Sequence, residues 1–119
     1  MSYQLDHSLA DGVLRIALSG ELKHDQLEKL RREVGELARG KATQRLLVDV
    51  RALHHSIGPL DTLRLIESYT EENPTWRTAV LETPEQMPGH HFHETAAINR
   101  GFRVLHFTDA AKAEAWLKR

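Results

Sequence analysis

The sequence predicts one α/β domain spanning all 119 residues, built on a mostly parallel β-sheet of about five strands. Three observations favour this fold class: a hairpin signal near the amino terminus, a continuous apolar run near the middle, and strand and helix patterns that alternate from there onward. The predicted order of elements is β-β-α-β-α-β-α-β-α. Parallel strands joined by helices require right-handed crossovers, so the helices are expected to pack on the sheet.

The hairpin signal consists of two short strands on either side of a tight turn. Residues Tyr3 to Ser8 and Val13 to Ser19 flank Ala10-Asp11-Gly12, and Asp-Gly is a strong signal for a two-residue hairpin turn. A helix is predicted next, from Asp25 to Arg39, and Gly40 ends it. Its apolar residues recur at helical spacing and predict a core-facing stripe: Leu27, Leu30, Val34, Leu37 and Ala38.

The apolar run Arg45–Val50 predicts a central strand covered on both faces, and only Asp49 interrupts it. The polar residues that follow predict a loop, after which Gly58-Pro59 opens a helix that extends to Glu72. Proline suits the first position of a helix because its missing N–H has no partner there in any case. The remaining predicted elements are a strand, a helix, a strand and a helix: Arg77–Glu82, His90–Asn99, Phe102–Phe107 and Asp109–Leu117.

The composition narrows the function classes. Sixteen basic and seventeen acidic residues nearly cancel, so the chain lacks the electrostatic footprint of a nucleic-acid-binding protein. The absence of cysteine excludes disulfides, thiolate metal sites and a thiol nucleophile. No apolar run reaches the length of a signal peptide or a membrane span, so a cytoplasmic protein is expected.

Several stretches of the chain resemble a known family. They are the central strand Leu46–Val50, Gly58 before the helix, the strand Thr78–Leu81, and a tail in which Ala97–Val104 is followed by Phe107-Thr108-Asp109 and Ala115-Trp116-Leu117. These stretches are similar to the STAS domains of bacterial anti-sigma factor antagonists (SpoIIAA-like proteins), and closest to the small bacterial STAS/SEC14-like proteins. The resemblance implies a SpoIIAA-like (STAS) fold and a regulatory or binding role without catalysis.

The antagonists of that family carry Asp-Ser-Ser-Gly before the second helix, and a kinase phosphorylates the serine that precedes the glycine. Aligned on Gly58, this chain reads His55-Ser56-Ile57-Gly58, so the phosphoacceptor position holds Ile57 and the remaining hydroxyl stands one residue early. A helix amino terminus favours a phosphate group. Because its hydroxyl is displaced, Ser56 is interpreted as a loop or capping residue.

We expect the second helix and the loop before it to form a recognition surface, because partners and ligands of α/β proteins meet the carboxyl ends of the strands. The occupant is a protein partner or a second copy of the chain, which would make a homodimer. A small apolar or lipid-like ligand beneath the second and third helices is the alternative, with Ile57, Met87 and Phe92 as its lining. The predicted contact residues are His54, His55, Ser56, Ile57, Gly58, Leu60, Met87 and Phe92.

Eight histidines raise a further hypothesis, a zinc or other divalent metal site, although no cofactor is expected overall. Two histidine groups follow neighbouring strands, and His90, His93 and Glu94 share one helical face by their spacing. The motif differs from the His-Glu-x-x-His of metalloproteases. The candidate ligands are His54, His55, His90, His93 and Glu94.

Asp49 is the one charged residue inside an apolar strand, which makes it a candidate buried acid or base. Its place near the predicted strand end favours a simpler role, in which its carboxylate accepts hydrogen bonds from the following loop. Asp49, His55 and Ser56 match a hydrolytic triad only in residue type, and no nucleophile-elbow pattern accompanies them. The sequence therefore predicts a binding module and not an enzyme.

Overall fold

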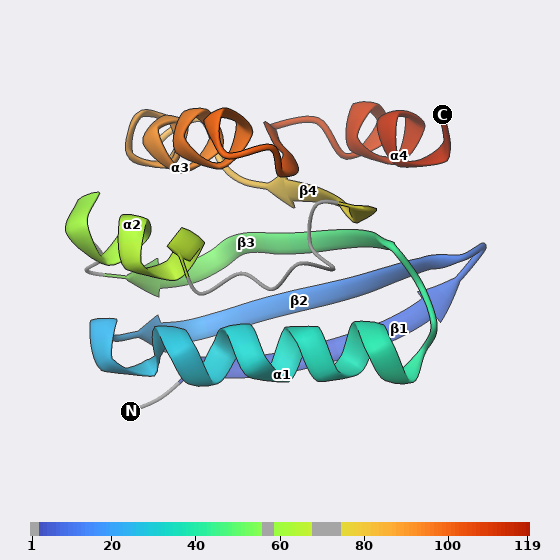
Figure 1. Cartoon of the computed structure of the whole chain (residues 1–119), viewed down its shortest axis with the longest axis horizontal. Coiled ribbons are helices and arrows are strands. Elements are labelled where there is room, and N and C mark those ends of the chain that lie inside the picture. The colour runs from blue at the N-terminus through green and yellow to red at the C-terminus, as the bar shows by residue number, and fades with distance from the viewer. Residues whose placement is uncertain (1–2, 56–58, 68–74) are drawn as a thin grey trace.

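The computed structural model describes residues 3–55, 59–67 and 75–119, and it confirms the predicted fold class and order of elements (Figure 1). The strands are β1 Tyr3–Ala10, β2 Val13–Leu22, β3 Arg45–His55, β4 Arg77–Leu81 and β5 Arg103–Phe107. The helices are α1 Leu27–Gly40, α2 Pro59–Glu67, α3 Met87–Asn99 and α4 Ala110–Lys118, with a 3-10 turn at His24–Gln26 before α1. The predicted extension of the second helix to Glu72 lies outside the described residues. No helix among the described residues is long and apolar enough to span a membrane.

The strands form one sheet in the order β1-β2-β3-β4-β5. β1 and β2 pair in antiparallel fashion, and every other neighbouring pair is parallel. The hairpin turn has positive φ angles at Asp11 and Gly12, 55° and 75°. That geometry is the type I′ turn, whose twist matches the twist of the strands it joins.

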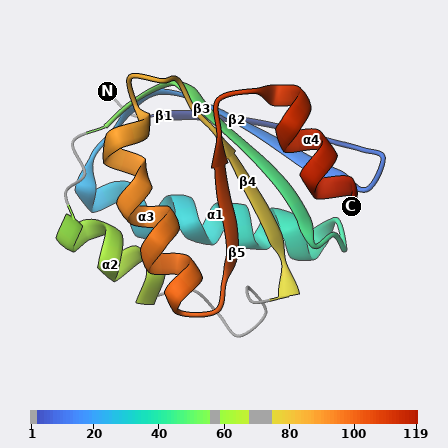
Figure 2. The same cartoon turned by 90° about the horizontal axis from the view of Figure 1, so that it is seen from above.

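Helices cover both faces of the sheet, but unequally. The first face carries α1, α2 and α3, and α4 packs on the second (Figures 1 and 2). The ion pair between Arg15 on β2 and Glu114, 2.7 Å, ties α4 to the sheet. The buried core of the first face consists of Leu14, Ile16, Leu18, Leu22, Ala38, Leu46, Val50, Leu53, Ile66, Trp76, Val80, Ala96, Ala97 and Val104. The second, smaller core consists of Val13, Leu47, Ala79, Leu81, Ala113 and Leu117.

The prediction that the third strand ends at Val50 is wrong, because β3 continues to His55. A β-bulge interrupts the alternation of the two faces, so the sequence pattern does not reveal that the strand continues. The register between β2 and β3 shifts after the pair Ala17–Asp49, and the extra residue reverses the alternation of faces. Val50 and Leu53 are therefore both buried in the first core, although they are an odd number of residues apart. His54 and His55 belong to a paired strand and not to a loop.

The third helix begins at Met87 and not at the predicted His90. Two residues of the preceding turn bind each other: Gln86 Oε1 accepts the backbone N–H of Thr83, 2.9 Å, and Thr83 Oγ1 accepts that of Gln86, 3.3 Å. This reciprocal pattern resembles a capping box and starts the helix directly after the turn. The proline in the first helical turn does not oppose this start, because N–H groups there have no acceptor within the helix.

Candidate functional site

Large apolar side chains are exposed on α2 and α3, two helices that pack against each other, and two of them are predicted contact residues. Leu60, at the start of α2, is 62% exposed, and Phe92 on α3 is 40% exposed. Both are predicted contact residues, and their exposure favours a surface contact over the enclosed apolar pocket also predicted for Phe92. The predicted contacts Ser56, Ile57 and Gly58 lie outside the described residues, as do the side chains of His55 and Met87.

The loop between β4 and α3 is fastened to the carboxyl end of β3. Gln86 Nε2 donates hydrogen bonds to the carbonyl oxygens of Val50, 2.9 Å, and Leu53, 3.3 Å. β4 pairs with β3 only as far as Asp49, so these carbonyls belong to a part of β3 that β4 does not reach. The Gln86 amide supplies donors there and holds the start of α3 beside the end of β3.

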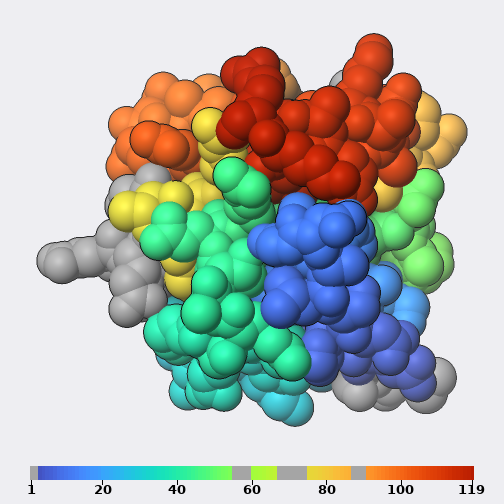
Figure 3. All heavy atoms as spheres, turned by 90° about the vertical axis from the view of Figure 1, so that its right-hand side faces the viewer, coloured from blue at the N-terminus to red at the C-terminus, as the bar shows by residue number. Residues whose placement is uncertain are grey.

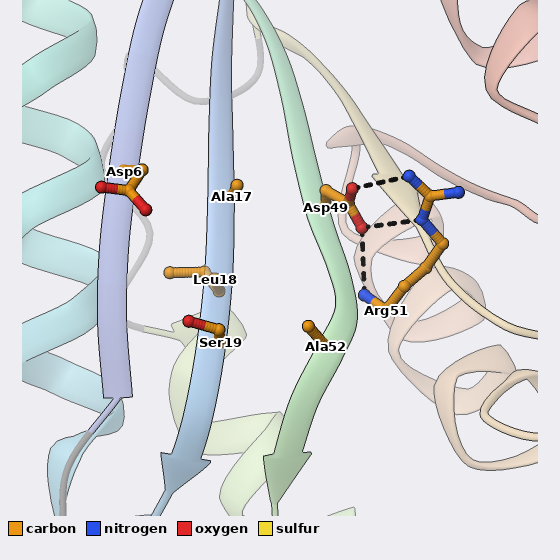
Figure 4. Close-up of a pocket in the computed structure, with 7 residues that line it drawn as sticks. All are labelled: Asp6, Ala17, Leu18, Ser19, Asp49, Arg51 and Ala52. Atoms are coloured by element: carbon orange, nitrogen blue, oxygen red, sulfur yellow. Dashed lines mark hydrogen bonds and ion pairs between the residues drawn. The ribbon is translucent and has the colours of Figure 1, made fainter.

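Asp49 stabilises the bulge in β3. Its Oδ1 accepts the backbone N–H of Arg51 at 3.0 Å, and its carboxylate binds the guanidinium of Arg51 through contacts of 3.0 and 2.9 Å (Figure 4). The partial burial of Asp49 raises the pKa of its carboxyl group, but the hydrogen bonds and charge of Arg51 outweigh burial and lower it overall. Asp49 thus accepts a hydrogen bond from its own strand, where the sequence analysis expected one from a loop.

We expect Asp49→Ala to destabilise the protein by about 1 kcal/mol, because it removes the acceptor of the Arg51 N–H and a half-exposed ion pair. Asp49→Asn keeps an acceptor oxygen and should cost less. Since the pKa of Asp49 is lower in the folded state, its stabilising effect is present above its unfolded pKa, 3.8, and is lost as the pH falls below that value. Urea unfolding of the three proteins at neutral and acidic pH measures both effects. An equal loss in the alanine and asparagine variants would contradict the role in the bulge.

Beside this ion pair, the second face of the sheet has an open hollow of about 510 Å³. It lies on the first three strands, and Figure 4 shows Asp6 on β1 and the Asp49–Arg51 pair on β3 at opposite sides of small β2 residues. Arg51 already forms an ion pair with Asp49, so a ligand in the hollow would have to compete with Asp49 for the guanidinium. The hollow is lined by Asp6, Ala17, Leu18, Ser19, Asp49, Arg51 and Ala52.

A buried carboxylate and two imidazoles form a hydrogen-bonded chain between β4, β5 and α3. Glu82, just after β4, is 1% exposed, and its Oε1 lies 2.5 Å from Nδ1 of His106 on β5. Nε2 of His106 lies 3.0 Å from Nδ1 of His93 on α3. The backbone N–H of His106 donates to Oε2 of Glu94, 2.6 Å. We refer to Glu82, His106 and His93 as the acid–imidazole chain.

Burial, together with the nearby negative charge of Glu94, raises the pKa of Glu82 from 4.5 to about 7, and burial is the larger cause. A carboxyl group with that pKa exchanges its proton near neutral pH. Since the carboxyl group is almost fully buried, the exchange depends on the groups to which it is hydrogen-bonded.

The acid–imidazole chain can hold its protons in two arrangements. When Glu82 is ionised, Nδ1–H of His106 donates to it and Nδ1–H of His93 donates to His106. When a proton arrives at Nε2 of His93, each imidazole can pass its Nδ1 proton inward, and Glu82 becomes the neutral acid. The chain can thus carry a proton between the half-buried histidine and the buried carboxyl group without leaving either hydrogen bond unmade.

The structure separates the predicted metal ligands into those it describes and those it does not. His93 and Glu94 lie next to each other on α3 and both contact His106, whereas His54 lies at the register position of Glu21 on β2. Among the described residues, no group of three or more histidine or acidic side chains is arranged to hold a metal ion. The side chains of His55 and His90 lie outside the described residues, so the metal hypothesis stays a prediction.

Two members of the acid–imidazole chain, Glu82 and His106, were not predicted from the sequence. Each stands at or inside a short apolar strand, Arg77–Glu82 and Phe102–Phe107 as predicted, and that interruption was the available signal. Asp49 interrupts its strand in the same way, but the sequence does not show that Glu82, just after β4, and His106 on β5 lie close enough to share a hydrogen bond.

No family model matches the chain, and no curated protein matches it. Solved structures do. An anti-sigma factor antagonist from Mycobacterium paratuberculosis is 18% identical with a TM-score of 0.66, and the match covers 99% of this chain and 96% of that one. An uncharacterised protein with a SpoIIAA-like fold from Shewanella loihica is 18% identical with a TM-score of 0.62, covering 97% and 93%.

A third similar structure is the anti-sigma factor antagonist SpoIIAA in its unphosphorylated form. It is 17% identical with a TM-score of 0.63, and the match covers 99% of this chain and 98% of that one. At such identities the similarity concerns the fold alone. The chain therefore has a SpoIIAA-like fold, as the family resemblance implied.

Proposed function

We propose that this SpoIIAA-like domain is a non-enzymatic regulatory module that binds a protein partner through α2, the segment before it and the adjoining surface of α3. Two of its structural neighbours are named anti-sigma factor antagonists, a name that denotes action on another protein. By analogy of fold, the partner is a regulatory protein of the anti-sigma factor kind. A second copy of the chain is the alternative occupant of the same surface.

The observation that carries this proposal is the exposure of Leu60 and Phe92. Large apolar side chains in solvent are typical of the centre of protein interfaces, where a few residues supply most of the binding energy. Gln86 fixes the start of α3 against β3, so at least one of the two helices presents its apolar side chain from a rigid position. A preformed surface of this kind binds at a lower entropic cost of ordering than a flexible one.

A charge placed on the surface is expected to weaken partner binding. We expect Leu60→Glu and Phe92→Glu each to weaken capture of the partner by about tenfold or more, because a buried, unpaired carboxylate opposes the contact. Ala115→Glu, on an exposed position of α4, adds the same charge on the opposite face and is the control. The four proteins are immobilised in parallel, and quantitative mass spectrometry identifies what each captures from cells that make the chain.

The supporting result is a protein that the wild type and the α4 variant retain and both surface variants lose, confirmed by calorimetry with the purified partner. Sedimentation of the same variants shows whether the occupant is a second copy. Identical captured proteins on all four, with no change in sedimentation, would overturn the proposal.

A further inference from the structure

β1 leaves one of its sides without a strand neighbour in the part of the chain that the structure describes. The strand is eight residues long, and its register with β2 runs from Tyr3 to Ala10 without a bulge. All residues from Asp6 to Ala10 are exposed, including Leu9 at 44%. Figure 3 shows the hairpin, in dark blue, uncovered beside α4.

This edge lacks most of the features by which proteins usually protect a free strand, and its one acidic residue is Asp6. Such strands are short or bulged, or they carry lysine or proline. β1 has none of these features, whereas β5, at the other edge of the sheet, has five residues, and Glu94 accepts the backbone N–H of His106. Of the two edge strands, β1 is therefore the better suited to pair with a further strand.

The hairpin turn determines which backbone groups of β1 face outward. In a two-residue hairpin, the residues that flank the turn, Ala10 and Val13, form a hydrogen-bonded pair, and such pairs alternate along the ladder. The N–H and C=O groups of the intervening β1 residues therefore point away from β2. Those residues are Tyr3, Leu5, His7 and Leu9.

We propose that β1 binds β1 of a second copy of this chain in antiparallel fashion, with His7 on the two-fold axis. This register places the outward-facing backbone groups of both strands opposite each other. It also pairs Leu5 of each copy with Leu9 of the other, on the face of the sheet that carries the first core. The exposed leucine thereby gains an apolar neighbour.

The charges agree with the same register. Asp6 faces Ser8 of the second copy, whereas a register centred one residue earlier would place the two Asp6 carboxylates opposite each other, which is destabilising. Registers centred two residues before or after His7 would pair fewer residues of the two β1 strands. The pairing consumes the free edge of both copies, so it ends in a closed dimer with one continuous sheet and leaves α2 accessible.

Sedimentation equilibrium of the full chain, from micromolar to millimolar concentration, tests the proposal. We expect a dimer whose dissociation constant rises by about tenfold or more in Leu9→Lys and in His7→Pro. The proline removes an N–H that points away from β2, so the hairpin ladder itself is preserved. Ile98→Lys is the matched control, since Ile98 is 46% exposed on α3, and this variant is expected to dimerise like the wild type.

A disulfide tests the register, because the chain has no cysteine of its own. In the proposed pairing, positions 6 and 8 of opposite copies form a non-hydrogen-bonded pair with Cα atoms about 4.5 Å apart, within the range that a disulfide spans. Asp6→Cys/Ser8→Cys is expected to form a covalent dimer on mild oxidation, and peptide mapping should join position 6 to position 8. Asp6→Cys alone should not. A monomeric wild type, or a dimer that Leu60→Glu dissociates and Leu9→Lys does not, would overturn the proposal.

Discussion

Replacing Glu82 with glutamine is expected to abolish most of the decrease in stability that the wild type shows as the pH rises from about 5 to 8, because glutamine stays neutral throughout this range. The folded pKa of Glu82, about 7, lies above its unfolded value of 4.5, so the folded state holds a proton that the unfolded state releases. The associated stability is fully present below about pH 4.5 and is lost as the pH rises through 7. The pKa difference corresponds to about 3 kcal/mol.

Urea unfolding of wild type and Glu82→Gln across this pH range measures the effect. Glu85→Gln is the matched control, because Glu85 is an exposed glutamate in the turn that follows β4. Its unfolding free energy should follow the pH dependence of the wild type. Nitrogen-15 spectra of His106 and His93 should show both rings changing tautomer near pH 7 in the wild type and not in Glu82→Gln. If the glutamine variant loses as much stability with pH as the wild type, the acid–imidazole chain does not hold the proton as described.

The second large effect is expected at Leu117, which anchors α4. Its side chain is fully buried in the smaller core with Val13, Leu47 and Ala113, and α4 is the helix that covers this part of the second face. We expect Leu117→Ala to destabilise the protein by about 2 to 5 kcal/mol, since the cavity has few neighbours that can close it. Hydrogen exchange should accelerate first in α4, because the larger core on the other face is untouched.

Lys118→Ala is the control for this change, because Lys118 is exposed next to Leu117 on the same helix. It is expected to change the free energy of unfolding by no more than about 0.5 kcal/mol. A loss below about 1 kcal/mol in Leu117→Ala would show that α4 is held mainly by other contacts, such as the ion pair between Arg15 and Glu114.

The elements that the sequence predicted correctly are those with local signals. Asp11-Gly12 specifies the hairpin turn because both residues tolerate positive φ. The stripe from Leu27 to Ala38 specifies α1, because an apolar face at helical spacing has to be buried against the sheet. The error in β3 arose where a non-local contact decided the boundary, because β2 provides a partner for Ala52–His55. The earlier start of α3 follows from the reciprocal hydrogen bonds between Thr83 and Gln86, and Gln86 also reaches across to β3.

The candidate site divides in the same way. The sequence identified Leu60, Phe92, His93 and Glu94 by residue type and by their place after strands. It did not predict that Leu60 and Phe92 stay exposed, because exposure depends on how helices pack. The sequence also did not predict that His93 contacts His106 and, through it, Glu82, because these residues meet only when the sheet has assembled.

By itself, then, the sequence determined the order of strands and helices and the hairpin, because turn chemistry and apolar periodicity act over a few residues. Its resemblance to a known family implied the SpoIIAA-like fold. Only the tertiary structure decided that β3 passes through a bulge braced by Asp49, that a carboxyl group with a pKa near 7 is buried beside two imidazoles, and that β1 presents a free edge. Each of these depends on which strands become neighbours, and that is a property of the assembled sheet.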